Sequence, residues 1–232
     1  MLIPNAGGVS AAAIATPNDS ETPNPGFDVD GHRGDLRAIG RSRHFLRNRQ
    51  IYSEGDDADC VFKVESGVVR TYKLLRDGRR QINAFHGPGS VFGLEIGKVY
   101  GISAAAASDC AVTSYGRRNL EALAAYNDQL LLQLFSSVML SLAREQEHSV
   151  SLGRRSATEK LAIFLLSCAG QSAGGRDILL EMSRKDIADY LGLTIETVSR
   201  TFSDLEHRAF IELHGARRVR LTDITGLRDL CA

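Results

Sequence analysis

The sequence has few of the features that favour a metal site, a secreted fold or a membrane span. Its four cysteines are far apart and form no Cys-x-x-Cys pair or Cys/His cluster, which argues against structural zinc and iron–sulfur ligand sets. The first 25 residues contain no Lys or Arg, so the charged start of a secretory signal is missing. No apolar run reaches the ~18 residues that a membrane span requires. We therefore expect a cytoplasmic protein with reduced thiols, no membrane partner, no metal and no cofactor.

An excess of charge of one sign is also missing. The 28 Lys and Arg residues balance 28 Asp and Glu residues, so the formal net charge is zero. Proteins that coat nucleic acid or membranes by bulk charge need a large positive field, and this class is disfavoured. A small basic surface is still compatible with neutrality. The 232 residues, 43% of them hydrophobic, suffice for one or two ordinary domains with a buried core.

The N-terminal half divides into a polar, proline-containing tail at residues 1–30 and a strand-rich segment at residues 31–119. Short alternating runs broken by glycine occur at residues 60–64, 68–72 and 81–85. Asp77-Gly78 lies between two of these runs and is a strong hairpin signal, because both residues tolerate positive φ. Short strands with regular turns predict a small antiparallel β-roll.

The segment at residues 120–153 changes to a helical period and predicts one long helix from about residue 120 to 152. Its apolar residues recur at intervals of three and four. A single small roll cannot cover so long an apolar stripe, so a dimerisation helix is favoured over a helix packed only on its own roll. The residues expected in the coiled-coil-like seam are Leu131, Leu134, Val138 and Leu142.

Residues 154–232 predict a separate α+β domain, and residues 183–202 have the pattern of a helix-turn-helix. Each helix has an apolar inward face, and Gly192 lies where the chain must turn sharply. Ser183 and Thr194 are expected to cap the first and second helix. A purely structural pair of helices would need none of the polar residues that follow. The pattern therefore indicates DNA binding.

The second of these helices has a polar face suited to reading bases. Glu196 and Arg200 project together because they are four residues apart. Arg200 offers a bidentate donor that fits O6 and N7 of guanine, while Glu196 can accept from the N4 amine of cytosine. The alternative is an ordinary surface ion pair worth a fraction of a kcal/mol. Further DNA-binding residues expected on this helix are Thr194, Ile195, Thr197 and Ser199.

Other basic residues are placed for contacts with the DNA backbone. The N-terminus of the first helix exposes N–H groups, which with Ser183, Arg184 and Lys185 are expected to hold a phosphate. A β-hairpin around residues 214–216 is expected to form a wing on the flanking DNA. The wing residues expected to contact the backbone are His214, Arg217 and Arg218.

The whole chain after the tail resembles the cAMP receptor protein/FNR (Crp/Fnr) family of bacterial transcription regulators. The segment from Ile195 to Arg200 is similar to the E-x-x-S-R motif of the FNR branch, and Ser199 stands where the cAMP-receptor branch has glycine. The resemblance implies an α+β fold with an N-terminal antiparallel β-roll (a cyclic-nucleotide-binding-like jelly roll), a long dimerisation helix and a C-terminal winged helix-turn-helix.

The resemblance also implies function and partners. Members of the FNR branch use the Glu, Ser and Arg of this motif on palindromic double-stranded DNA with TTGA and TCAA half-sites. It further implies a homodimer that activates transcription by contacting RNA polymerase. Because N-terminal cysteines are missing, the chain looks most like the FixK-type subgroup, whose members act in microaerobic or nitrogen-fixation gene control.

Departures from the family pattern bear on which small molecule or cofactor the protein could sense. Ile102 stands where cAMP-binding members carry the Arg that neutralises the cyclic phosphate, so cAMP binding is not expected. The first cysteine is Cys60, inside the roll, which disfavours an FNR-type iron–sulfur sensor. A haem-binding member would need a histidine ligand, and the loop residue His86 is expected to be merely solvated.

Two alternatives stay open at this point. One is a regulator of the same fold that responds to haem or another small ligand, and the other is a cyclic-nucleotide-binding interaction module. An enzyme is not expected, because the sequence has no nucleophile–base constellation, metal cluster or Walker loop.

Overall fold

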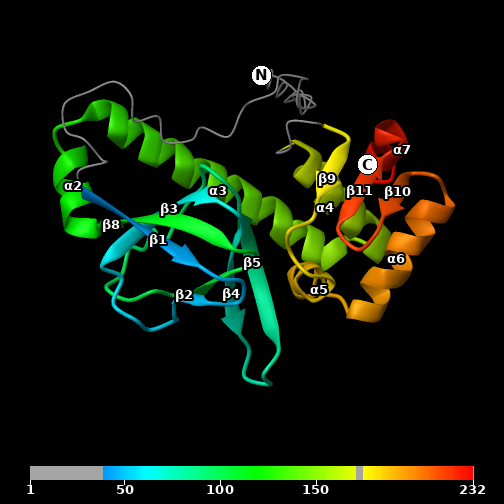
Figure 1. Ribbon diagram of the computed structural model, residues 1–232, viewed down its shortest axis with the longest axis horizontal. Coiled ribbons are helices and arrows are strands. Elements are labelled where there is room, and N and C mark those ends of the chain that lie inside the picture. Colours follow the sequence, from blue (N-terminus) through cyan, green and yellow to red (C-terminus); the bar gives the residue numbers. More distant parts are fainter. Residues whose placement is uncertain (1–38, 171–174, 232) are drawn as a thin grey trace, which may run out of the picture.

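The computed structural model describes residues 39–170 and 175–231. The tail predicted at residues 1–30 lies outside the described residues. The roll and the C-terminal segment lie side by side, and one long helix runs along both of them (Figure 1). No helix formed by the described residues is long and apolar enough to cross a bilayer.

The roll is built from two four-stranded sheets whose paired strands are antiparallel. The first sheet has the order β1 (Gly40–Phe45), β8 (Cys110–Gly116), β3 (Cys60–Ser66) and β6 (Val91–Phe92). The second has the order β2 (Gln50–Tyr52), β7 (Ser103–Ala106), β4 (Val69–Leu74) and β5 (Arg80–His86). The predicted strands and roll are confirmed.

The β4–β5 hairpin turns where the sequence predicted it. Gly78 has φ of +82°, and the N–H of Leu75 donates to the carbonyl of Arg79 at 2.8 Å. Glycine adopts this left-handed conformation without a steric penalty, which explains the local signal. The hairpin extends well beyond the rest of the roll (Figure 1).

Aromatic rings fill the space between the two sheets. Tyr52 stacks on Tyr100 with ring centroids 3.7 Å apart and on Phe62 at 5.5 Å. Phe62 in turn stacks on Phe92 at 5.2 Å. All four side chains are buried. Because aromatic side chains bury large apolar areas, this cluster forms the core of the roll.

The helical segment after the roll consists of two helices, so the prediction of one uninterrupted helix from residue 120 was wrong at its N-terminal end. α2 (Arg117–Ala124) ends before Asn127, which caps α3 (Asp128–Arg154). Its side-chain oxygen accepts from the N–H of Leu130 at 3.0 Å. The apolar period continues across this cap, and periodicity alone therefore did not reveal the break.

The C-terminal segment contains helices around a three-stranded sheet with the order β10-β11-β9. Its helices are α4 (Ala157–Gly170), α5 (Arg184–Leu191), α6 (Ile195–His207) and α7 (Ile224–Asp229). Its strands are β9 (Asp177–Leu179), β10 (Ile211–His214) and β11 (Arg218–Leu221). The predicted helix-turn-helix and wing hairpin are confirmed, and the fold class with them. The addition of β9 to the wing and the helix α7 were not predicted.

The core of the C-terminal segment continues into the roll. Ala107, which follows β7, is fully buried in this core, and Val68 and Phe85 of the roll pack against it. The separate domain expected at residues 154–232 stays a prediction. The segment has its own core, but part of that core is supplied by the outer face of the roll, because sheets and helices bury their apolar faces against one another.

Candidate nucleic-acid interface

The start of the helix-turn-helix is fixed by a capping box. The N–H of Asp186 donates to the Ser183 hydroxyl at 3.1 Å, and the N–H of Ser183 donates to the Asp186 carboxylate at 3.1 Å. This arrangement satisfies N–H groups that would otherwise be unpaired at the helix end. Ser183 therefore caps α5, as the sequence predicted, and its hydroxyl is committed to Asp186.

The turn and the second cap also match the sequence. Gly192 has φ of +65°, and a Cβ there would lie 3.3 Å from a methyl group of Leu152. Both the left-handed backbone and the close approach of α3 favour glycine. The Thr194 hydroxyl accepts from the N–H of Thr197 at 3.1 Å and so caps α6.

α6 has one buried face and one exposed face. Val198, Phe202 and Leu205 are buried at 2% exposure or less and pack in the C-terminal core. Glu196, Ser199 and Arg200 are exposed. We call these three residues the recognition face. The structure brings them together on one side of a helix that is anchored on the other, which is the geometry a helix needs to enter the major groove.

Glu196 is held at the first turn of α6. Hydrogen bonds from its own N–H and from the Thr194 hydroxyl keep the pKa of its carboxyl below the ordinary value, and the charge of Arg200 adds to this effect. The carboxylate is thus ionised at neutral pH. An ionised carboxylate accepts hydrogen bonds only, as a contact with a cytosine amine requires.

The remaining candidate residues of α6 differ in how far their side chains are available for contacts with DNA. Ile195 is 41% exposed, so its side chain is available for an apolar contact. Thr197 is half-buried, and its hydroxyl lies 3.1 Å from that of Thr194. The two hydroxyls are engaged in the cap, which leaves Thr194 and Thr197 less free for DNA than the sequence suggested.

Arg184 lies elsewhere than the sequence led us to expect. Its guanidinium carbon is 3.3 Å from the centroid of the Phe202 ring, and its Nη1 is buried without a hydrogen-bond partner in the structure. Burial lowers the pKa of the guanidinium to about 10. A cation on an aromatic face is attracted by the ring quadrupole. Its role as a phosphate contact stays a prediction that requires the side chain to leave this ring.

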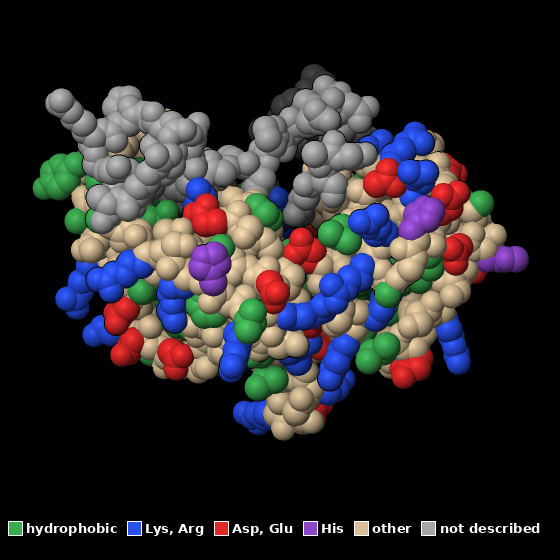
Figure 2. Space-filling view, viewed as in Figure 1, with side chains coloured by type: hydrophobic (Ala, Val, Ile, Leu, Met, Phe, Trp, Pro, Cys, Tyr) green, Lys and Arg blue, Asp and Glu red, His purple; other side chains and the backbone are tan. Residues whose placement is uncertain are grey.

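Lys185 and the wing residues lie on the surface, and their contacts with the DNA backbone stay a prediction. Lys185, Arg217 and Arg218 are exposed, and Lys and Arg side chains gather over the wing and along the edge where α5 lies (Figure 2). His214 is also exposed, with its Nε2 3.6 Å from the Glu212 carboxylate. An acidic neighbour makes His214 a weaker phosphate contact than the two arginines.

The exposed apolar stripe of α3 differs in one position from the expected seam. Leu131, Val138 and Leu142 are 52%, 44% and 49% exposed. Leu134 is instead half-buried and packs against the cluster formed by the roll, α2 and Leu130. Phe135, 61% exposed, completes the stripe and was missed. The dimerisation seam itself stays a prediction.

Comparison with known proteins agrees with this geometry. A model of the Crp-like helix-turn-helix domain matches residues 159–230, and one of the cyclic nucleotide-binding domain matches residues 42–127. The nitrogen fixation regulation protein FixK of Rhizobium meliloti is 42% identical over 183 residues, which cover 79% of this chain and 83% of that protein. The chain belongs to the Crp/Fnr family of transcription regulators.

Other Crp/Fnr relatives support the same assignment. FixK of Azorhizobium caulinodans is 44% identical over 200 residues, covering 84% of this chain and 81% of that protein. The structure of FixK2 from Bradyrhizobium japonicum has a TM-score of 0.80 and 40% identity, and covers 84% of this chain and 98% of that chain. The resemblance to the FixK subgroup is therefore confirmed. These relatives are named as regulators rather than enzymes.

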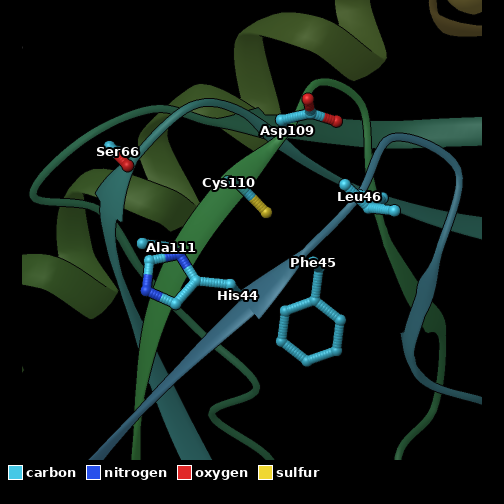
Figure 3. Close-up of a pocket in the computed structure, with 7 residues that line it drawn as sticks. All are labelled: His44, Phe45, Leu46, Ser66, Asp109, Cys110 and Ala111. Atoms are coloured by element: carbon cyan, nitrogen blue, oxygen red, sulfur yellow. The ribbon is translucent and has the colours of Figure 1, made fainter.

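The roll of this Crp/Fnr protein has a small pocket at the end of β1, of about 250 Å³. Figure 3 shows the Cys110 sulfur and the Phe45 ring beside it. The described side chains that line it include no Lys or Arg: His44, Phe45, Leu46, Ser66, Asp109, Cys110 and Ala111. Burial raises the pKa of the Cys110 thiol to about 11, so it is protonated at neutral pH. A cyclic phosphate would find no counter-charge here.

The roll histidines correct one sequence expectation. His86 is at the end of β5, and its Nε2 lies 3.1 Å from the Thr71 hydroxyl. Its ring stacks on Phe92 at 5.3 Å. Burial, with a smaller contribution from Arg144, lowers the pKa of His86 to about 4. His86 is therefore a half-buried strand residue in contact with Thr71 and Phe92 rather than a solvated loop residue, and His44 in β1 is a second histidine of the roll.

Proposed function

We propose that this Crp/Fnr regulator is a homodimeric activator that binds palindromic DNA with TTGA and TCAA half-sites. The observation that carries the proposal is the recognition face, which stands exposed on a helix whose opposite face is buried. Arg200 would donate in a bidentate manner to guanine, and Glu196 would accept from a cytosine amine. Ser199 and Ile195 would contact neighbouring bases.

The remaining residues would hold the DNA backbone. Lys185, Arg217 and Arg218 are exposed and basic, so they can neutralise phosphates on either side of the recognition helix. Arg184 and His214 are weaker candidates because each already has a partner in the protein. Such contacts would set the position of α6 without reading sequence.

The dimer would form through α3. The stripe of Leu131, Phe135, Val138 and Leu142 has the three- and four-residue spacing that packs two helices together. A C2 dimer would place two recognition helices about 34 Å apart, one turn of DNA. Replacing Phe135 by Glu should shift sedimentation from dimer to monomer, whereas Ser136→Glu, which is exposed on α3 but lies outside the stripe, should not.

The biological role is proposed from the relatives. The FixK proteins are named for the regulation of nitrogen fixation, and we propose the same field of control, or microaerobic control, for this chain. Activation would require contact with RNA polymerase in the cytoplasm, where the chromosome lies.

Selection of bound duplexes from a random pool tests the proposal. We expect enrichment of a TTGA…TCAA palindrome by the wild-type protein. Arg200→Ala should lose the preference at the guanine, while Arg208→Ala should keep it, because Arg208 is near the end of the same helix and lies 3.4 Å from Asp204. Enrichment of no sequence, or of an unrelated one, would refute the proposal.

A further inference from the structure

Four charged residues join the roll to the first helix of the helix-turn-helix. Arg80 Nη2 lies 2.6 Å from the Asp186 carboxylate and 2.7 Å from that of Asp189. Arg70 Nη1 lies 3.1 Å from Asp186, at an ion-pair distance but without hydrogen-bond alignment. Arg70 is on β4, Arg80 on β5, and both aspartates are on α5. We call these four residues the junction cluster.

The junction cluster is largely removed from water. Arg70 is 5% exposed and Asp186 is 3% exposed, while the side chains of Arg80 and Asp189 are 19% and 18% exposed. A buried charge that loses its partner strongly destabilises the folded protein, so the charged groups of the cluster must stay in contact with one another. Salt also screens buried pairs much less than surface pairs. The cluster is therefore a specific contact rather than a chance surface pairing.

Asp186 has two structural tasks in this cluster. Burial raises the pKa of its carboxyl, but hydrogen bonds from Ser183 and the charges of Arg70 and Arg80 outweigh this effect and hold the pKa below its ordinary value. The same carboxylate closes the capping box of α5. Arg70 and Arg80 of the roll thus pair with the carboxylate that closes the N-terminal turn of α5. The C-terminal end of α5 leads directly into the turn to α6.

Uncharged contacts extend the junction along the same edge. Gln81 Nε2 donates to the Tyr190 carbonyl at 3.2 Å, and the Phe85 and Tyr190 rings are 5.3 Å apart. Tyr190 also stacks on His148 of α3 at 3.9 Å. The first helix of the helix-turn-helix is therefore held by β5 on one side and by α3 on the other.

We propose that Arg70 and Arg80 are positioning residues for DNA recognition, which set the orientation of α5 and α6 relative to the roll through Asp186 and Asp189. The proposal rests on the proposed function above. In a dimer joined through α3, the orientation of α6 on each roll determines the distance and angle between the two recognition faces. The junction cluster therefore determines which spacer between half-sites the dimer accepts.

Binding to palindromes with different spacers tests this role. The duplexes carry the selected half-sites with the selected spacer, or with one or two base pairs added or removed. We expect Arg80→Gln and Asp189→Asn each to weaken binding about tenfold at the selected spacer, within the range of coupling energies for contacting residues. Binding at the altered spacers should change less than threefold, so the spacer preference relaxes.

Matched variants distinguish positioning from loss of folding. Arg79→Gln removes a neighbouring arginine that pairs only locally, with Asp77 at 2.7 Å, and should leave spacer preference unchanged. Thermal unfolding followed by circular dichroism shows whether each variant is folded. If Arg80→Gln does not fold, Asp189→Asn carries the test, because it leaves both arginines paired with Asp186. Arg80→Lys, which keeps a cation between the two carboxylates, should retain the preference at least in part.

The contrary outcomes are equally definite. An equal loss at every spacer, no loss at any spacer, or a relaxation of spacer preference in Arg80→Lys as large as that in Arg80→Gln would overturn the proposal. The failure of the proposed function is distinguishable, because it would appear in the wild-type protein as binding without sequence preference.

Discussion

The roll interior and the recognition face differ in how they use their side chains. In the roll, four aromatic rings stack on one another and are 6% exposed or less. On α6, Glu196, Ser199 and Arg200 remain exposed above a buried apolar face. From this comparison we expect the roll interior to contribute chiefly to stability and the recognition face chiefly to the proposed DNA specificity. Substitutions in the two regions should therefore have separable effects.

Removing a ring from the roll should have the largest effect. Phe62→Ala is expected to lower the free energy of unfolding by about 3–5 kcal/mol, because it removes buried area and leaves a cavity. Urea denaturation measures the change, and Leu46→Ala, at a site 67% exposed, should change it by less than about 0.5 kcal/mol. The fraction that remains folded should keep its preference among DNA sequences. A small loss of stability would show that the interior is loosely packed.

Acid should weaken the junction behind the recognition face. Burial, with a smaller contribution from Lys160, lowers the pKa of His148 to about 4 from its ordinary value of 6.5. Between these values the unfolded chain binds a proton that the folded chain does not, so stability is full above pH 6.5 and falls toward pH 4. The loss is about 3 kcal/mol at most for this residue.

The matched variant for this test is His148→Phe, which keeps a ring against Tyr190 but cannot titrate. Its free energy of unfolding, measured in urea from pH 7 to pH 4, should depend less on pH than that of the wild type. An identical slope in the two proteins would show that His148 does not contribute.

Truncation within the recognition face should reduce affinity and leave stability unchanged. Arg200→Ala is expected to cost about 1–3 kcal/mol on the selected palindrome and to relax discrimination at the guanine. Fluorescence anisotropy with matched and mismatched duplexes measures both effects. If all sequences lost the same affinity, Arg200 would be a backbone contact instead.

The smallest effect is expected outside the recognition face, at Lys185 of α5. Lys185→Ala should weaken binding to all sequences alike and reduce the slope of log affinity against log salt by about one. Titrations at several salt concentrations measure this slope. A loss confined to particular sequences would place Lys185 against a base rather than a phosphate.

The sequence predicted the helix-turn-helix accurately because its signals are local. Ser183 and Thr194 lie next to the N–H groups that they cap, and Gly192 requires only its own φ. Such contacts span a few residues, so a short segment contains all the information needed. The recognition face follows from the same helical period.

Positions that depend on distant partners were predicted less well. Leu134 turns toward the roll while Phe135 remains exposed. Arg184 resembles a phosphate contact by its position after Ser183, but the Phe202 ring offers it a nearer partner. In each case tertiary packing selects between alternatives that the local pattern leaves equal.

The sequence by itself determined the strand-rich roll, the helix-turn-helix and the residues that α6 exposes. Only the tertiary structure decided that Arg80 meets Asp186 and Asp189, from which it is separated by 106 and 109 residues. The physical reason is range, because caps, turns and helical periods depend on neighbours along the chain. A buried ion pair depends instead on two surfaces that come together only when the roll and the helix-turn-helix pack.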